Sequence, residues 1–234
     1  MPQEHIYKQF DTELETVRSR VLQMGGLVEQ QIVNAIEAMS SGDLEVMNKV
    51  IEEDRRVNSF DVMIDEMCQH IIARRQPAAT DLRMVMTMIK TTTDLERIGD
   101  EAEKIARMSK MIYETDRFHL PRFNEVRHMA ELAVDMLRRA LDAFARLDMA
   151  TAAHVVRADI TVDEEYRAII RQLITFMMED PRTITTSLEI LSIAKALERI
   201  GDHSKNMCEY IVYLVKGKDV RHTSVEEIER EALQ

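Results

Sequence analysis

The stretch LERIGD at residues 95–100 returns unchanged at residues 197–202, 102 positions further along the 234-residue chain. Upstream of it, D-x-x-V-N at 54–58 matches D-x-x-V-D at 159–163 with an offset of 105. The three-residue difference between the offsets falls near Pro77, where a connection can change length at little cost. Six identical residues in a row make chance similarity between amphipathic helices a poor explanation, so the sequence predicts two copies of one structural unit.

Breakers are few, and the segments between them are rich in the good helix formers Ala, Leu, Met, Glu and Arg. Asp43 suits an N-cap, Pro121 suits a first turn, and Asp180-Pro181 is typical of a cap followed by the first helical residue. Gly217 can end a helix, and S-x-x-E at 224–227 resembles a capping box. We predict helices over 5–40, 44–75, 80–113, 121–147, 149–178 and 181–216, and a short helix after 224.

The apolar spacing indicates helices that pack inside bundles. In the fourth predicted helix, large and small apolar residues recur on one wide stripe that includes Met129, Leu137 and Phe144. No alternating strand pattern and no Asn-Gly or Asp-Gly turn is present. The predicted fold is all-α, with two tandem antiparallel three-helix bundles. The predicted division is a first bundle over 1–116, a second over 117–218, and a C-terminal tail over 219–234.

The charge balance and the uncharged runs limit the classes of function. Asp and Glu number 42 against 31 Lys and Arg, a net charge of -11, which argues against nucleic-acid binding and leaves room for cationic partners such as metal ions. No signal peptide is recognisable, and the longest runs without a charged residue are eight residues, against ~20 for a membrane span. Cys68 and Cys208 form no metal or redox motif, so two reduced, buried thiols are expected.

Pairs of acidic residues four apart share one face of a helix. Such pairs are Glu96 with Asp100, Glu198 with Asp202, and Asp159 with Asp163. In antiparallel helices, residues at equal distance from the connecting turn lie at one level. The level pairs are Asp54 with Asp100, Asn58 with Glu96, Asp159 with Asp202, and Asp163 with Glu198. Each repeat therefore brings four oxygen-bearing side chains to one level, provided that they face each other.

An all-oxygen, mostly anionic set suits hard divalent cations, and like charges at this spacing repel unless something neutralises them. We therefore predict metal sites in both repeats, with Mg, Mn, Fe and Zn left open. The competing interpretation is a solvated acidic stripe, in which Arg97 pairs with Glu101 and Lys205 with Glu209. Gly99 and Gly201, inside helices, let either a neighbouring helix or a metal cluster approach the backbone.

Two tandem three-helix bundles with duplicated E-x-x-x-D motifs inside LERIGD resemble the PhoU family of bacterial phosphate-signalling proteins, over nearly the whole chain. The resemblance implies a cytoplasmic, non-enzymatic negative regulator, commonly dimeric, that links the ATPase subunit of a phosphate ABC transporter to a sensor histidine kinase. It also implies restraint of phosphate uptake, and contact with the membrane only through partners. Asn58 stands where the second repeat has Asp163, so the first cluster is expected to be the weaker one.

Two other classes of function remain open from the sequence. A metal-dependent hydrolase could use carboxylate clusters with open coordination positions to activate water. No nucleotide-binding or nucleophile motif supports this, and Lys104 alone follows a cluster residue by four positions. The remaining class is a structural helical bundle without metal.

Overall fold

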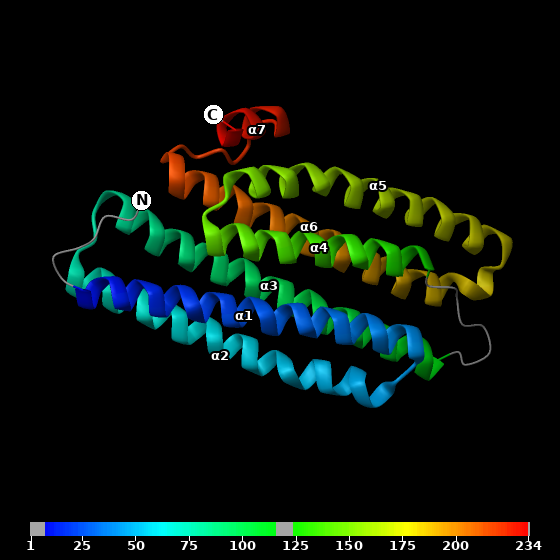
Figure 1. The fold of residues 1–234 in the computed structure, drawn as a ribbon. Helices are drawn as coiled ribbons and strands as arrows, with labels where there is room; N and C mark the ends of the chain where they lie inside the picture. The colour runs from blue at the N-terminus through cyan, green and yellow to red at the C-terminus, as the bar shows by residue number, and fades with distance from the viewer. Residues whose placement is uncertain (1–7, 116–123, 234) are drawn as a thin grey trace.

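The computed structural model describes residues 8–115 and 124–233 (Figure 1). The helices of these residues are α1 (Lys8–Ser41), α2 (Leu44–Arg75), α3 (Ala79–Thr115), α4 (Asn124–Arg146), α5 (Met149–Glu179), the 3-10 turn η1 (Pro181–Thr183), α6 (Ile184–Lys216) and α7 (Val225–Leu233). The expected all-α fold is confirmed. The start expected for the first helix, the expected role of Pro121, and the boundary drawn between 116 and 117 lie outside the described residues.

The ends of the helices follow local capping chemistry. The carboxylate of Asp43 accepts hydrogen bonds from the backbone N–H groups of Glu45 and Val46 at 3.0 and 3.1 Å, as expected of an N-cap. Gly217 ends α6 in the left-handed region with φ of 73°. Asp180 accepts from the N–H of Arg182, but Pro181 opens a three-residue 3-10 turn, so α6 begins at Ile184 and not at 181 as predicted.

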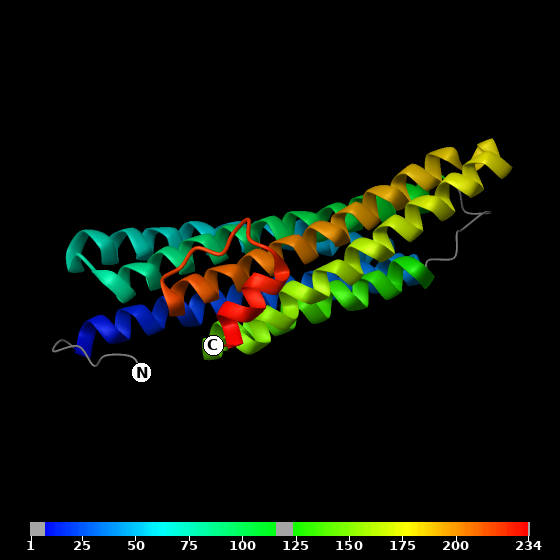
Figure 2. The same ribbon diagram turned by 90° about the horizontal axis from the view of Figure 1, so that it is seen from above.

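Two antiparallel three-helix bundles lie side by side along an elongated molecule (Figures 1 and 2). Helices α1–α3 form the first bundle and α4–α6 the second. The most extensive contact in the molecule is between α3 and α6, and α1 also touches α4. The short helix α7 folds back onto α5 near its start. The LERIGD helices α3 and α6 therefore form the centre of the molecule.

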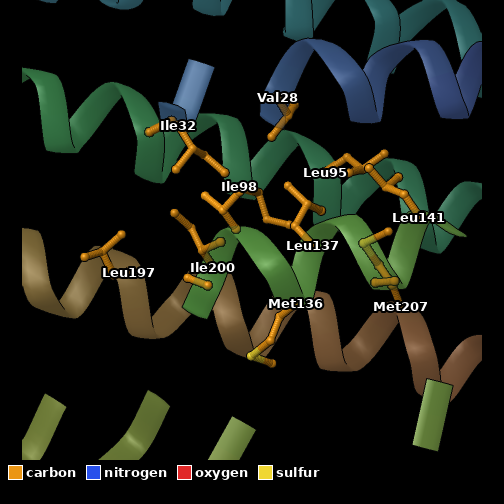
Figure 3. Packing of buried hydrophobic residues seen from close by; sticks show 14 of the residues in the cluster. Val28, Ile32, Leu95, Ile98, Met136, Leu137, Leu141, Leu197, Ile200 and Met207 are labelled. Atoms are coloured by element: carbon orange, nitrogen blue, oxygen red, sulfur yellow. The ribbon is translucent and has the colours of Figure 1, made fainter. Parts of the chain in front are cut away.

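One continuous hydrophobic core joins both bundles. Ile98 and its counterpart Ile200 are both fully buried, and Figure 3 shows them close together where α3, α4 and α6 meet. Nearly all of the apolar stripe predicted for the fourth helix is buried in α4, including Met129, Leu137 and Phe144. Cys68 and Cys208 are free and buried, as expected.

The contact between the bundles also contains buried polar pairs. Nδ1 of His203 on α6 lies 2.7 Å from Oδ1 of Asp94 on α3, with 7% and 2% of the two residues exposed. Arg199 on α6 forms an ion pair of 2.7 Å with the buried Glu101 on α3. The sequence interpretation paired Glu101 with Arg97, whereas in the structure Glu101 pairs with Arg199 of the other repeat. Polar bonds fix the register between the two bundles here, because a slip would leave buried charges unpaired.

At Gly99 and Gly201, the second helix of each bundle packs against the backbone of the LERIGD helix. A Cβ on Gly99 would lie 3.0 Å from Val57 Cγ1, whereas a Cβ on Gly201 would lie 3.4 Å from the matching Val162 Cγ1. The close approach of α2 thus explains Gly99, whereas at Gly201 a Cβ would make only an ordinary van der Waals contact.

We expect Gly99→Ala to lower the free energy of unfolding by about 1 kcal/mol, and Gly201→Ala to leave it unchanged or raise it slightly. Alanine gains ~1 kcal/mol in helix propensity at both positions, but at 99 it must push Val57 aside, which costs roughly 1–3 kcal/mol. Urea unfolding of both variants measures this difference. Equal effects at the two positions would contradict it.

Candidate functional site

The first predicted cluster lies where α2 meets α3, and its most buried member is Asp54, with 8% of the residue exposed. Oδ2 of Asp54 accepts a hydrogen bond of 2.9 Å from Nδ2 of Asn58. Oδ1 of Asp54 is buried and has no hydrogen-bond partner among the described residues. It lies 3.4 Å from the position that a Cβ on Gly99 would take, next to the fully buried and likewise unpaired Oε1 of Gln31. Asp54 is therefore level with the LERIGD stretch, as the sequence predicts.

The remaining carboxylates of the first cluster stand more open to solvent. Glu96 is half-buried and Asp100 is exposed. Burial raises the pKa of Glu96, and the charges of Asp100, Asp61 and Asp54 raise it further. Burial likewise raises the pKa of Asp100, followed by repulsion from Asp54 and Glu103. The negative charges therefore act on one another across α2 and α3, and a cation between them would relieve this repulsion.

Asp61 and Glu103 were missed by the sequence analysis. Glu103 follows Asp100 by three residues, a spacing that also places two side chains on one helix face. It raises the pKa of Asp54, second only to the effect of burial. Glu103 forms an ion pair of 2.5 Å with Arg107 on the same helix. Helical spacing could have indicated Glu103, but only the packing of α2 on α3 brings Asp61 near Glu96.

The second predicted cluster, between α5 and α6, contains the equivalent Asp159, which is 6% exposed. Nζ of Lys205 donates a hydrogen bond of 2.7 Å to Oδ2 of Asp159. The sequence interpretation paired Lys205 with Glu209. The ammonium instead reaches across the contact between α5 and α6 to the buried Asp159.

Two further acidic members of the second cluster have basic neighbours. Glu198 binds Lys195 at 2.6 Å, a local partner that the four-residue spacing rule did not reveal. Asp163 faces Arg167 at 3.7 Å. Burial raises the pKa of Asp202, and the charges of Asp159 and Glu198 add to the effect. The second cluster thus has the predicted acidic residues and, in addition, its own cations.

The donor set of the first cluster fits a hard divalent ion, because it consists of oxygen atoms and includes the unpaired, buried Oδ1 of Asp54. Among residues 8–115 and 124–233, no three His, Cys, Asp or Glu side chains converge closely enough to hold an ion in this conformation. Unscreened carboxylates repel one another, so an ion would have to draw the exposed Asp100 and the half-buried Glu96 inward. Both are on the surface side, where side chains turn at little cost.

Glu209, one turn beyond Lys205 on α6, is also buried. Burial raises its pKa to about 7, although Lys205 and Arg221 pull it down. In the unfolded chain the pKa is 4.5, so both states are protonated at low pH and the folded state carries an unfavourable charge above pH 7.

We therefore expect Glu209→Gln to stabilise the protein by roughly 2 kcal/mol at pH 8 and by almost nothing at pH 4. The gain should develop between pH 4.5 and 7, the interval between the two pKa values. Chemical denaturation across this pH range measures it. A gain of equal size at pH 4 would show that charge is not its cause.

A cleft of about 620 Å³ opens at the far end of the second bundle, between α4, α5 and α6. Its apolar lining includes Ile169, Leu173, Phe176 and Ile190. None of its lining residues belongs to either carboxylate cluster. The cleft therefore brings no enclosed substrate pocket to the carboxylates.

Fold and clusters together define a class: helical proteins built from two sequence-related three-helix bundles, each with carboxylates at the same register. Comparison with known proteins agrees with this description. The PhoU domain model matches residues 21–109 and 126–211, once in each bundle. The chain belongs to the PhoU domain family.

Relatives with curated names match almost the whole chain. One from Serratia marcescens, named phosphate-specific transport system accessory protein PhoU, is 50% identical over 226 residues, covering 97% of this chain and 92% of the relative. One of the same name from Escherichia coli K12 is 47% identical, with 97% and 93% covered.

Solved structures show the same fold. The crystal structure of PhoU from Pseudomonas aeruginosa matches with a TM-score of 0.86 and 47% identity, covering 89% of this chain and all of that one. The phosphate transport system regulatory protein PhoU from Streptococcus pneumoniae matches with 0.84 and 30%, covering 90% and 99%. No described helix combines the length and the apolar character needed to cross a membrane.

Proposed function

We propose that this protein is a negative regulator of the phosphate-starvation response and a modulator of phosphate uptake. It works as a cytoplasmic adaptor, without catalysis, between the ATPase subunit of a phosphate ABC transporter and a sensor histidine kinase. The relationship to accessory proteins of phosphate transport over 97% of the chain is the observation that carries this proposal. Long helices with exposed faces, such as α2 and α5, offer the surface that protein partners need.

The proposal includes a homodimer that reaches the membrane through its partners. It also includes a divalent ion in the first cluster, with Asp54, Glu96 and Asp100 as carboxylate ligands and the amide oxygen of Asn58 as a further donor. The bond from Nδ2 of Asn58 to Asp54 leaves that amide oxygen available. Such an ion would neutralise repelling charges on α2 and α3 and hold the two helices together.

A phosphate-starvation reporter in cells that lack this gene tests the regulatory role. In phosphate-replete medium, we expect the reporter to be switched on constitutively and to be silenced by the gene supplied on a plasmid. Pulldown of the transporter ATPase and the kinase from the same cells tests the adaptor role. A reporter that stays off in the deletion strain would refute the negative-regulator role.

A hydrolase was the alternative from the sequence, and it makes a separate prediction. A hydrolase should turn over a phosphoester when Mn²⁺ or Mg²⁺ is added, and the Asp100→Ala variant should lose this activity. We expect no such turnover, because Asp100 lies on an open helix surface and the cleft at the end of the second bundle lies among other residues.

A further inference from the structure

The two repeats carry opposite charges at two matched positions beside the carboxylates. With the offset of 102 that relates the LERIGD stretches, Glu103 in α3 corresponds to Lys205 in α6, and Arg107 corresponds to Glu209. Each pair is four residues apart on its helix, so the order of the charges is reversed between the repeats. The repeats therefore preserve the carboxylates while exchanging the charge that lies next to them.

In the second repeat, the exchanged residue places an ammonium group on the deepest carboxylate. Lys205 Nζ lies 2.7 Å from Asp159 Oδ2, and only 29% of the lysine side chain is exposed. Burial alone would lower the pKa of Lys205, but the hydrogen bond to Asp159 together with the charges of Asp159, Glu209 and Asp202 raises it, so the lysine stays charged. Lys195 adds a second ammonium at Glu198.

In the first repeat, the same position adds a negative charge. Glu103 joins Asp54, Glu96 and Asp100, and its partner Arg107 is more than half exposed. Position 93, which corresponds to Lys195, is a threonine. The buried Oδ1 of Asp54 has no charged partner among the described residues and lies beside the neutral side-chain amide of Gln31. The first cluster thus combines more negative charge with a buried carboxylate that is bonded to a neutral amide and to no ammonium group in the part of the chain that the structure describes.

We propose that Lys205 is a built-in cation that takes, in the second cluster, the place that a divalent ion takes in the first. Each chain then binds its divalent ion in the first repeat alone. The inference rests on the proposed ion in the first cluster. It reverses the sequence expectation that Asn58 makes that cluster the weaker one, since the charge of Glu103 replaces the charge absent at 58, and two lysines offset the charge of Asp163.

Competition between the Lys205 ammonium group and a divalent ion explains why only the first cluster binds the ion. An ion entering the second cluster must displace Lys205 from a buried carboxylate while the lysine remains tethered nearby, so two cations repel at short range. In the first cluster, no ammonium group of the described residues is bonded to Asp54, whose Oδ2 accepts from the neutral amide of Asn58, and the charge of the entering ion relieves existing repulsion. The difference needs no change of fold, because in both clusters the glycine of LERIGD lies against the matching residue of the neighbouring helix, Val57 or Val162.

Binding of Mn²⁺ to the metal-free full-length chain, followed by isothermal titration calorimetry, tests the inference. Asp54→Asn and Asp159→Asn are matched isosteric variants, one in each repeat. We expect Asp54→Asn to abolish Mn²⁺ binding and Asp159→Asn to leave stoichiometry and affinity within twofold of the unaltered protein. Loss of the same binding in Asp159→Asn, or a halved stoichiometry in both variants, would overturn the inference.

A second set of variants tests Lys205 itself. With the first cluster silenced by Asp54→Asn, adding Lys205→Met should create Mn²⁺ binding in the second cluster and a Mn²⁺-dependent rise in melting temperature. Lys205→Gln, which can still donate a hydrogen bond to Asp159, serves if the methionine variant does not fold. Lys216→Met removes one charge from the same helix away from the cluster and should create no binding.

The outcomes separate this inference from the proposed function. Absence of Mn²⁺ binding in the unaltered chain would refute the ion in the first cluster, while the regulatory role would still be judged by the reporter. Failure of both Lys205 variants to gain Mn²⁺ binding would refute the role of Lys205, even if the first cluster binds its ion. Gain of Mn²⁺ binding in either Lys205 variant would support it.

Discussion

Mn²⁺ at about one hundred times its dissociation constant is expected to raise the melting temperature of this protein by roughly 5–10 °C. Binding to the folded state alone stabilises it by ~2.7 kcal/mol at that concentration, and in a chain of this size each kcal/mol shifts the midpoint by ~2–4 °C. The free energy comes from relieving repulsion among Asp54, Glu96, Asp100 and Glu103. Differential scanning fluorimetry with and without chelator measures the shift.

The variant Asp54→Asn is expected to change the melting temperature both with and without Mn²⁺. It should remove the Mn²⁺-dependent shift and at the same time raise the melting temperature of the metal-free protein at neutral pH. The reason is that burial and Glu103 raise the pKa of Asp54, so its charge is unfavourable in the folded state without a cation. Asp142→Asn, on the exposed side of α4, is the matched control and should leave the shift intact. An unchanged Mn²⁺ shift in Asp54→Asn would refute ligation by Asp54.

The second large effect is expected at the contact between the bundles. His203→Ala removes the partner that lies 2.7 Å from the buried Asp94, which keeps the longer bond of 3.4 Å from Nδ2 of Asn206. Loss of one member of a buried pair costs about 3 kcal/mol. The melting temperature should therefore fall by ~6–12 °C. Urea unfolding gives the free energy directly.

A double-mutant cycle distinguishes this pair from simple loss of packing. Asp94→Leu combined with His203→Leu removes both polar groups, so the double variant should be more stable than the sum of the single effects predicts. Strict additivity would show that the two side chains do not depend on each other. His154→Ala, on the exposed side of α5, is the control for loss of a histidine and should have little effect.

Much of the fold could be predicted because local chemistry decides it. Asp43 and Gly217 mark helix ends through capping and a left-handed backbone, and both act within one turn of the chain. The repeated LERIGD stretch shows which helix of one repeat corresponds to which helix of the other. The level of Asp54 opposite this stretch follows from helix rise alone. These predictions need no knowledge of how the bundles contact each other.

The features that were missed depend on tertiary packing. Helical periodicity shows which face of α3 is apolar, but not that Glu101 meets Arg199 of the other bundle. Lys205 could reach Glu209 or Asp159, and only the packing of α5 on α6, which brings Asp159 within 2.7 Å of its ammonium group, decides between them. The 3-10 turn after Asp180 likewise depends on how α5 and α6 meet, so the sequence placed the start of α6 three residues too early.

We propose above all that the first carboxylate cluster is required for regulation of the phosphate response by this protein. The most direct test supplies the deletion strain with the Asp54→Asn, Asp100→Asn double variant and measures the starvation reporter in phosphate-replete medium, at protein levels matched to the unaltered gene. The account predicts that the reporter stays on, although the variant is folded and at least as stable without metal. A reporter silenced as fully as by the unaltered gene would contradict the account.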